Sequence, residues 1–215
     1  MTNETLSKIA YKELKKQILA GVYKPGERLL LDTVSKALNI SMTPLKDAFS
    51  KLEYDGLVET IPRKGAFVTK LSNSDFQDFI EIRIAFETFA IELYYKKGNP
   101  NIVGLQELEE LNRNVAKTIE DEDKTGFILA DMEFHQKMVS LAGNNRLTDM
   151  FSRFPLSNFI VLMGNEITTE EGHNVISQHE AIIKSLKEMN NLEETKQYVI
   201  ENITCLHKKL NFNFE

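Results

Sequence analysis

Apolar residues recur every three to four positions along nearly all of the second part of the chain, from residue 72 onward. This spacing lines one side of an α-helix, and no stretch there shows the alternation of a half-buried strand. The first of these helices is expected to end at Gly98-Asn99-Pro100. Further helices are expected at roughly 102–119, 124–142, 145–163 with a break near Pro155, 168–189 and 192–210. Residues 72–215 are therefore predicted to form an all-helical bundle of about six helices.

Residues 1–71 have a different pattern, in which three short helical stretches precede two short strands. The helices are predicted at 6–20, around Leu31–Leu38, and from Ser41 to a stop at Asp55-Gly56. The strands are predicted at Leu57–Thr60 and Ala66–Thr69, as a hairpin with a basic tip. Three helices followed by a hairpin predict a winged helix-turn-helix. We therefore expect a mostly α protein with two domains, 1–71 and 72–215.

Charge is unevenly divided between these two parts. The net charge is −6, yet residues 1–71 hold 12 Lys+Arg against 8 Asp+Glu, whereas residues 72–215 hold 14 against 24. A basic head on an acidic body indicates a polyanion-binding module joined to a domain with another role.

Cysteine content and hydropathy indicate the cellular compartment in which the protein resides. The single cysteine, Cys205, excludes a disulfide scaffold and favours a reducing compartment. No apolar run approaches the ~20 residues of a membrane helix, and the polar N-terminus does not have the pattern of a secretory signal. We therefore expect a cytoplasmic protein without membrane association.

The third predicted helix and the hairpin carry the residues expected to meet DNA. Ser41 or Thr43 would cap the helix, and Thr43 and Lys46 on its first turn would face the major groove. Arg63 and Lys64 at the hairpin tip would meet adjacent phosphates or the minor groove. The alternative is a small helical domain with a solvated basic face. The turn, the hairpin and the local charge together favour binding.

Three polar residues fall among the apolar positions of the helical part. Asp131 and His135 are four residues apart and so share one face of a helix, and His179 lies among apolar residues of another. Two imidazoles and a carboxylate directed into a bundle are a candidate transition-metal site. The alternatives are an ordinary hydrogen-bonded pair and a core histidine with its own partners. His173 is interpreted as a surface or loop histidine.

Arg83 lies on the inward side of the first long helix, four residues before Glu87. Its planar guanidinium could clamp the carboxylate of a small effector. Equally, Arg83 and Glu87 could form an internal ion pair, because residues four apart are neighbours on a helix.

Four short motifs run through residues 1–71: Pro-Gly-Glu-Arg-Leu, Ile-Ser-x-Thr-Pro-x-Lys-Asp-Ala, Leu-Glu-x-Asp-Gly-Leu-Val and Pro-Arg-Lys-Gly-Ala-Phe-Val. They resemble the DNA-binding head of the GntR family of bacterial transcription regulators. The resemblance implies that Ser41 begins the DNA-reading helix and that Gly65 allows close approach at the wing tip. Arginines are common in the family where this chain has Met42 and Lys46, so it implies binding of double-stranded operator DNA with a different base preference.

A second set of motifs lies in the helical part: Glu81-Ile-Arg83-x-x-x-Glu87, Asp131-Met-Glu-Phe-His135, Ala142-Gly143-Asn144 and Gln178-His179-Glu180-Ala181-Ile182-Ile183. They resemble the FCD ligand domain of the FadR branch of that family. Many members hold a divalent metal with one Asp and three His, and a small carboxylate effector completes the coordination. The resemblance therefore implies Zn, Ni or Mn as cofactor, with Asp131, His135 and His179 as ligands.

The last ligand of that pattern differs in this chain. Asn202 stands about where the family has its third His, and an amide oxygen is a harder and weaker ligand than imidazole. His207 follows five residues later, which turns its side chain by roughly 140° around a helix. It would serve only in a different helix register.

Three functions are compatible with these features. The first, which the sequence favours, is a metabolite-responsive repressor that binds a palindromic operator as a homodimer. The second is a metal-dependent enzyme fused to a DNA-binding head, and the third is an architectural DNA-binding protein without a ligand. We expect no enzymatic activity, because no nucleophile motif or general base accompanies the metal pattern.

Overall fold

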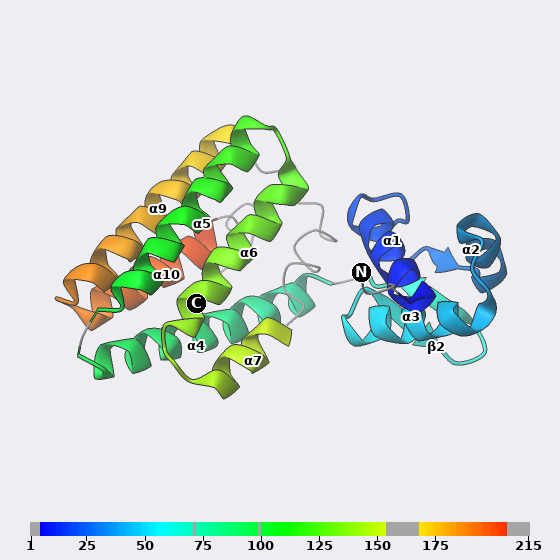
Figure 1. The fold of residues 1–215 in the computed structure, drawn as a ribbon, viewed down its shortest axis with the longest axis horizontal. Helices are drawn as coiled ribbons and strands as arrows, with labels where there is room; N and C mark the ends of the chain where they lie inside the picture. Colours follow the sequence, from blue (N-terminus) through cyan, green and yellow to red (C-terminus); the bar gives the residue numbers. More distant parts are fainter. Residues whose placement is uncertain (1–4, 71, 99, 154–167, 206–215) are drawn as a thin grey trace. The chain divides into compact units, whose positions relative to one another are not determined.

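The structure, a computed structural model, describes residues 5–70, 72–98, 100–153 and 168–205. These residues divide into two compact units, of which one ends at Ser72 and the other begins at Asn73. The described chain is mostly helical with one small sheet, as the sequence predicted (Figure 1).

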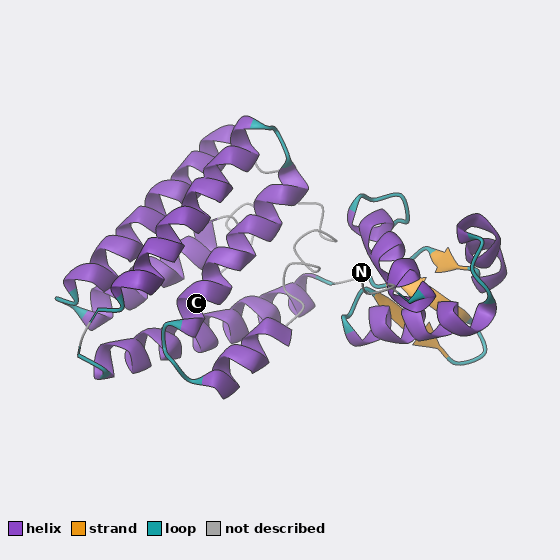
Figure 2. Ribbon diagram, in the orientation of Figure 1, coloured by secondary structure: helices purple, strands orange, loops and turns teal. Residues whose placement is uncertain are grey.

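The first unit combines three helices with a three-stranded antiparallel sheet (Figure 2). Its helices are α1 (Leu6–Leu19), α2 (Leu31–Leu38) and α3 (Met42–Tyr54). Its strands are β1 (Arg28–Leu29), β2 (Val58–Ile61) and β3 (Gly65–Val68), in the order β1-β3-β2. The hairpin lies within one residue of its predicted position. Strand β1 was not predicted, because two residues are too few to show alternation, and only pairing with β3 defines them.

The turn between α2 and α3 is built by a left-handed residue. Asn39 ends α2 with a φ of 51°, a conformation that asparagine tolerates better than most residues. Ser41 then occupies the N-cap position of α3, but its side chain makes no capping hydrogen bond, so the predicted capping contact is wrong. The Ser41 hydroxyl is exposed and does not cap the backbone of α3.

The core of the first unit lies between α1, α3 and the sheet. Ala10, Leu14 and Ile18 line the buried side of α1 at four-residue intervals, and α1 packs against α3. Ile9, the large apolar residue next to Ala10, is 42% exposed. The small Ala10 takes its place because the buried stripe is set by what α3 contacts, not by the largest side chain in each turn.

The second unit is an all-helical bundle, as predicted (Figure 1). Helix α5 packs against both α6 and α9, α10 packs against α4 and α9, and α4 also contacts α6. The predicted continuations of the 145–163 and 192–210 helices, and His207, lie outside the described residues. The helices are α4 (Asn73–Lys96), α5 (Ile102–Glu120), α6 (Lys124–Ser140), α7 (Asn145–Arg153), α9 (Thr169–Glu188) and α10 (Leu192–Cys205).

Local caps fix where the bundle helices begin. The side chains of Asn101 and Asp123 accept hydrogen bonds from backbone N–H groups at the starts of α5 and α6. Thr168 and Glu171 form a capping box at the start of α9. The caps at Asp123 and Thr168 begin α6 and α9, the two helices that carry the candidate ligands. Among the described residues, none of the helices combines the length and apolar character needed to cross a bilayer.

Candidate functional site

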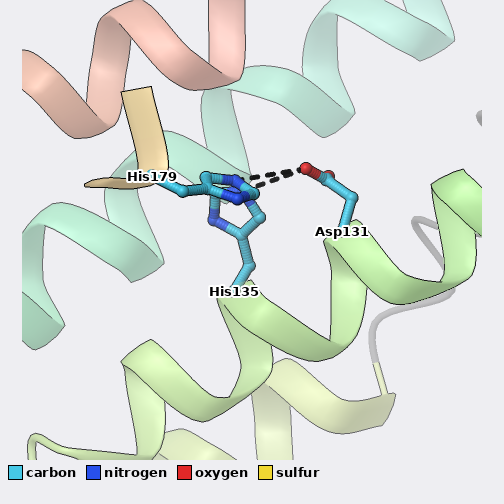
Figure 3. A group of neighbouring side chains, drawn as sticks. All are labelled: Asp131, His135 and His179. Atoms are coloured by element: carbon cyan, nitrogen blue, oxygen red, sulfur yellow. Dashed lines mark ion pairs between the residues drawn. The ribbon is translucent and has the colours of Figure 1, made fainter. Parts of the chain in front are cut away.

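Three side chains from two helices meet inside the second unit. Asp131 and His135 come from α6 and His179 from α9, and their ligand atoms all lie within 4.8 Å of one another (Figure 3). Asp131 Oδ1 is 3.3 Å from His179 Nε2 and 3.7 Å from His135 Nε2. The structure therefore brings together the three residues that the sequence proposed as metal ligands.

The cluster is closed off from solvent, and the ion pairs of its imidazoles with Asp131 are not hydrogen bonds. Both histidines are fully buried, and Asp131 is 7% exposed. Within the described residues, the Nε2 atoms of His135 and His179 are buried and have no hydrogen-bond partner. Buried polar atoms without a hydrogen bond are rare in folded proteins, and a bound water, a bound ion, strain or a functional role explains those that occur.

The other nitrogen of each histidine is held by a buried polar side chain. His135 Nδ1 lies 2.6 Å from Glu87 Oε2, and His179 Nδ1 lies 2.9 Å from Asn112 Oδ1. Such partners orient a metal-binding imidazole and leave its Nε2 lone pair for the metal. Sequence analysis named Glu87 only as a partner of Arg83 and missed Asn112. The available signal was an amide on the buried stripe of α5, between Leu108 and Val115.

Arg83, on α4, contacts both Glu87 and Asp131. Its Nε donates to Glu87 Oε1 at 2.6 Å, and its Nη2 lies 3.7 Å from Asp131 Oδ2. The internal Arg83–Glu87 pair is thus present. Nη2 is buried and has no hydrogen-bond partner among the described residues, so pairing with Glu87 does not use the whole guanidinium. Contact with an effector stays a prediction.

Electrostatics favour ionised Asp131 and Glu87 and a neutral His179. Burial alone would raise the pKa of Asp131, but His135, His179 and Arg83 outweigh it and hold that pKa below the ordinary value. Burial lowers the pKa of His179 below that of an ordinary imidazole, although Asp131 opposes this. For Glu87, burial is again outweighed, by His135 and Arg83, and its pKa is lowered. Anionic carboxylates and a neutral imidazole are the forms that bind a cation.

Asn202 and His173 occupy different surroundings. Asn202 on α10 is 4% exposed, and its Nδ2 donates to Oε1 of Gln178, the residue before His179. It therefore contacts the turn of α9 that carries His179, and its role as a further ligand stays a prediction. His173 is exposed on α9, in agreement with its interpretation as a surface histidine.

The candidate DNA-contacting residues lie on the surface of the first unit. Ser41, Thr43 and Lys46 are exposed at the start of α3, and Arg63 and Lys64 are exposed in the turn between β2 and β3. These positions leave the hydroxyl, ammonium and guanidinium groups available to phosphates and base edges.

Backbone geometry explains the glycine in the wing turn. Gly65 has a φ of 106°, which only glycine adopts readily. A Cβ at Gly65 would stand 3.4 Å from Arg28 Nε, so Arg28 on β1 lies beside this turn. Sequence analysis did not single out Arg28, although it is the arginine of the Pro-Gly-Glu-Arg-Leu motif. Its place beside the wing comes from the pairing of β1 with β3.

Both units match known protein families. Residues 6–68 match the gntR family of bacterial regulatory proteins, and residues 78–199 match the FCD domain. The chain belongs to the GntR family and carries an FCD domain. It is accordingly a transcription regulator with a DNA-binding head, as its motifs indicated.

Curated relatives of this GntR regulator are themselves regulators. The chain is 29% identical over 204 residues to the HTH-type transcriptional regulator YdhC of Bacillus subtilis, covering 93% of this chain and 89% of that protein. It is 22% identical to the gluconate operon transcriptional repressor of the same organism, with coverage of 84% and 74%. It is 27% identical to the repressor RspR of Escherichia coli, with coverage of 61% and 57%.

Solved structures share the fold over nearly the whole chain. A GntR regulator from Rhodococcus sp. RHA1 aligns with a TM-score of 0.78 at 22% identity, covering 96% of this chain and 98% of that one. McbR/YncC of E. coli aligns with a TM-score of 0.75 at 20% identity, with coverage of 97% and 100%. At these identities the likeness concerns the fold.

Proposed function

We propose that this GntR regulator is a metabolite-responsive repressor whose helical unit holds a divalent metal together with a small carboxylate effector. The observation that carries the proposal is a set of three buried atoms around Asp131 that have no hydrogen-bond partner in the described part of the chain: Arg83 Nη2, His135 Nε2 and His179 Nε2. All three face Asp131 in ion pairs of 3.3–3.7 Å without forming a hydrogen bond. A buried polar group without a hydrogen bond costs about 1–3 kcal/mol, so three beside one carboxylate favour a missing ligand.

The donor set fits a first-row divalent cation. Two imidazoles and one carboxylate suit Zn, Ni or Mn. The Nδ1 atoms of His135 and His179 each contact a buried polar side chain, as the second nitrogen of a metal-bound histidine usually does. Three protein ligands leave coordination positions open for a small molecule. Asn202 is a proposed fourth ligand through its amide oxygen, because its hydrogen bond to Gln178 uses only Nδ2. The metal would supply a Lewis-acid anchor for the effector.

Arg83 is proposed to bind the carboxylate of the effector. Its Nε is bound to Glu87, whereas Nη2 forms an ion pair with Asp131 Oδ2 at 3.7 Å but has no hydrogen-bond partner among the described residues. A guanidinium in this arrangement has one edge available for an anion. The effector class that combines a metal-binding group with a charge opposite to arginine is a small carboxylic acid.

The head is proposed to bind a palindromic operator through Ser41, Thr43 and Lys46 on α3 and through Arg63, Lys64 and Gly65 in the wing. Exposure of these side chains and the positive charge of residues 1–71 support this proposal. The names of the gluconate operon repressor and RspR support repression.

A homodimer is the proposed assembly, because two heads related by a twofold axis match a palindrome. Ile82 and Phe89 on α4 support it. They are seven residues apart on one face of the helix, and are 40% and 45% exposed. Large apolar side chains on one helix face favour contact with a second copy.

We propose that the metal group acts as a sensor and not as a catalytic centre. The relatives are named as regulators, and Glu87, a carboxylate that contacts the ligand set, is already bound to Arg83 and His135. Turnover of a small acid by the metal-loaded protein would favour the enzyme alternative.

The decisive experiment measures metal content and then ligand response of the full chain. Protein purified without chelator should contain one divalent ion per chain by elemental mass spectrometry. Small carboxylates should then raise the melting temperature of the metal-loaded protein and weaken its binding to the operator. No ion after incubation with Zn²⁺, Ni²⁺ or Mn²⁺ would contradict the metal part of the proposal.

A further inference from the structure

We infer that Asn112 is a positioning residue that selects the tautomer of His179 able to bind a metal, an inference that rests on the proposed metal site. Asn112 is 5% exposed and comes from α5, a helix that supplies none of the three candidate ligands. It acts through His179 and is not itself proposed to touch the metal.

Two hydrogen bonds fix which way the Asn112 amide faces. Its Nδ2 lies 3.2 Å from the carbonyl oxygen of Ile176, and its Oδ1 lies 2.9 Å from His179 Nδ1. A backbone carbonyl only accepts, so the amide NH₂ must face Ile176. Ile176 and His179 both belong to α9, so the amide is held on the same helix that carries the imidazole.

The orientation of the amide determines the position of the imidazole proton. An amide oxygen only accepts, so the partner of Asn112 Oδ1 must be Nδ1–H of His179. In a neutral imidazole the other nitrogen is then unprotonated. This nitrogen, Nε2, faces Asp131 and has no hydrogen-bond partner among the described residues. The geometry therefore presents a lone pair at the centre of the cluster.

Asn112 opposes a competing arrangement. In the other tautomer, Nε2–H of His179 would point toward Asp131 Oδ1, 3.3 Å away. A carboxylate is a stronger acceptor than an amide, so without Asn112 we expect the proton to move to Nε2. That proton would occupy the position required for the metal. Phe134 stacks on the His179 ring with centroids 3.7 Å apart, which fixes the ring plane but has no polar atom to choose a tautomer.

Asn112 also separates His179 from the surface. It lines a groove of about 370 Å³ between α5 and α9, together with charged residues that include Glu109 and Lys187. A smaller residue at this position would let water from the groove reach Nδ1 and replace the lost contact. Leucine, which has a similar volume and no polar atom, is therefore the informative substitution.

The first test is the tautomer of His179 in metal-free full-length protein. Long-range ¹H–¹⁵N correlation spectra of ¹⁵N-histidine-labelled protein, recorded above the ordinary imidazole pKa, should show the Nδ1–H form in the wild type. Asn112→Leu should shift His179 to the Nε2–H form, whereas Asn112→Asp, which keeps an acceptor oxygen, should retain Nδ1–H. Asn114→Leu, at an exposed position of the same helix, is the matched control and should leave the spectrum of His179 unchanged.

The second test is affinity for Zn²⁺ alone, measured by competition with a chromophoric chelator. Loss of a supporting partner typically costs about 10–100-fold in metal affinity, and we expect this for Asn112→Leu but not for Asn114→Leu. Unchanged tautomer and affinity in Asn112→Leu would overturn the inference. So would an Nε2–H tautomer in the wild type, a measurement that needs no variant to fold.

The two proposals fail in distinguishable ways. If the wild type has the Nδ1–H tautomer and Asn112→Leu loses it, but the wild type binds no Zn²⁺, then the metal function is wrong and the positioning role stands. If Zn²⁺ binds and the tautomer does not respond to Asn112, the positioning role is wrong and the metal function stands.

Discussion

His135 on α6 and Glu87 on α4 form a fully buried contact, with Nδ1 of the imidazole 2.6 Å from Oε2 of the carboxylate. The same carboxylate accepts a hydrogen bond from Arg83, so Glu87 connects the proposed metal ligand to the proposed effector-binding residue. A ligand that draws Arg83 toward it would therefore act on the partner of His135. The predictions below separate the contributions of these parts.

Removing a ligand should abolish metal binding. His135→Ala is expected to lower Zn²⁺ affinity by more than about 100-fold, because losing only a supporting partner already costs about 10–100-fold. Excess Zn²⁺ at 100 times its Kd should stabilise the wild type by about 2.7 kcal/mol, and chelation should remove this gain. Calorimetric titration and thermal unfolding measure the two effects. His173→Ala, at an exposed position, should behave as the wild type.

Replacing the Arg83 guanidinium should weaken effector binding and leave metal binding unchanged. Arg83→Lys keeps the positive charge near Glu87 but removes the planar fork. We expect carboxylate binding to weaken about tenfold or more, since hydrogen bonds to charged groups contribute roughly 1.5–3 kcal/mol. Zn²⁺ affinity should stay close to that of the wild type. An equal loss of both affinities would mean that Arg83 supports the cluster and does not contact the effector.

Lys46 tests the recognition helix. Because Lys46 is exposed at the start of α3, Lys46→Ala should leave the melting temperature unchanged while weakening operator binding. If Lys46 contacts a phosphate, the slope of log affinity against log salt should fall by about one. Gel-shift titrations at several salt concentrations measure this. Lys36→Ala, at an exposed position on α2, provides the comparison, and unchanged operator binding by Lys46→Ala would mean that α3 is not the reading helix.

Phe89 tests the proposed dimer. Phe89→Glu places a charge on the exposed face of α4, which an apolar contact between two copies would not tolerate. Light scattering after size-exclusion chromatography should show the mass falling from two chains to one. Val103→Glu, which is 65% exposed in the wild type at the start of α5, should stay dimeric. A dimer that persists in Phe89→Glu would place the interface elsewhere.

Much of the fold follows from local signals in the sequence. Periodic apolar residues define the helices of the bundle, and an asparagine at the end of α2 with a serine two residues later marks the turn before α3. Helical geometry alone puts Asp131 and His135 on one face, since residues four apart are neighbours. The exposed arginine and lysine of the wing are equally local, because a turn between two strands leaves its side chains in solvent.

Other features required the packed structure. Ile9 and Ala10 are adjacent on α1, and only the contact with α3 decides that Ala10 is the buried one. Arg28 reaches the side of Gly65 because β1 pairs with β3, and two residues of strand leave no pattern in the sequence.

The sequence by itself determined the order of helices, the two-part organisation and the chemistry of the candidate ligands. Tertiary structure decided how those ligands are oriented. His179 meets Asp131 because α6 and α9 bring distant segments together, and Glu87 and Asn112 reach the two imidazoles from two further helices. Spacing along one helix specifies which residues share a face, but hydrogen bonds between helices depend on how the helices pack. The sequence therefore proposed the candidate ligands, and the packing of the bundle decided that Nε2 of each histidine faces Asp131.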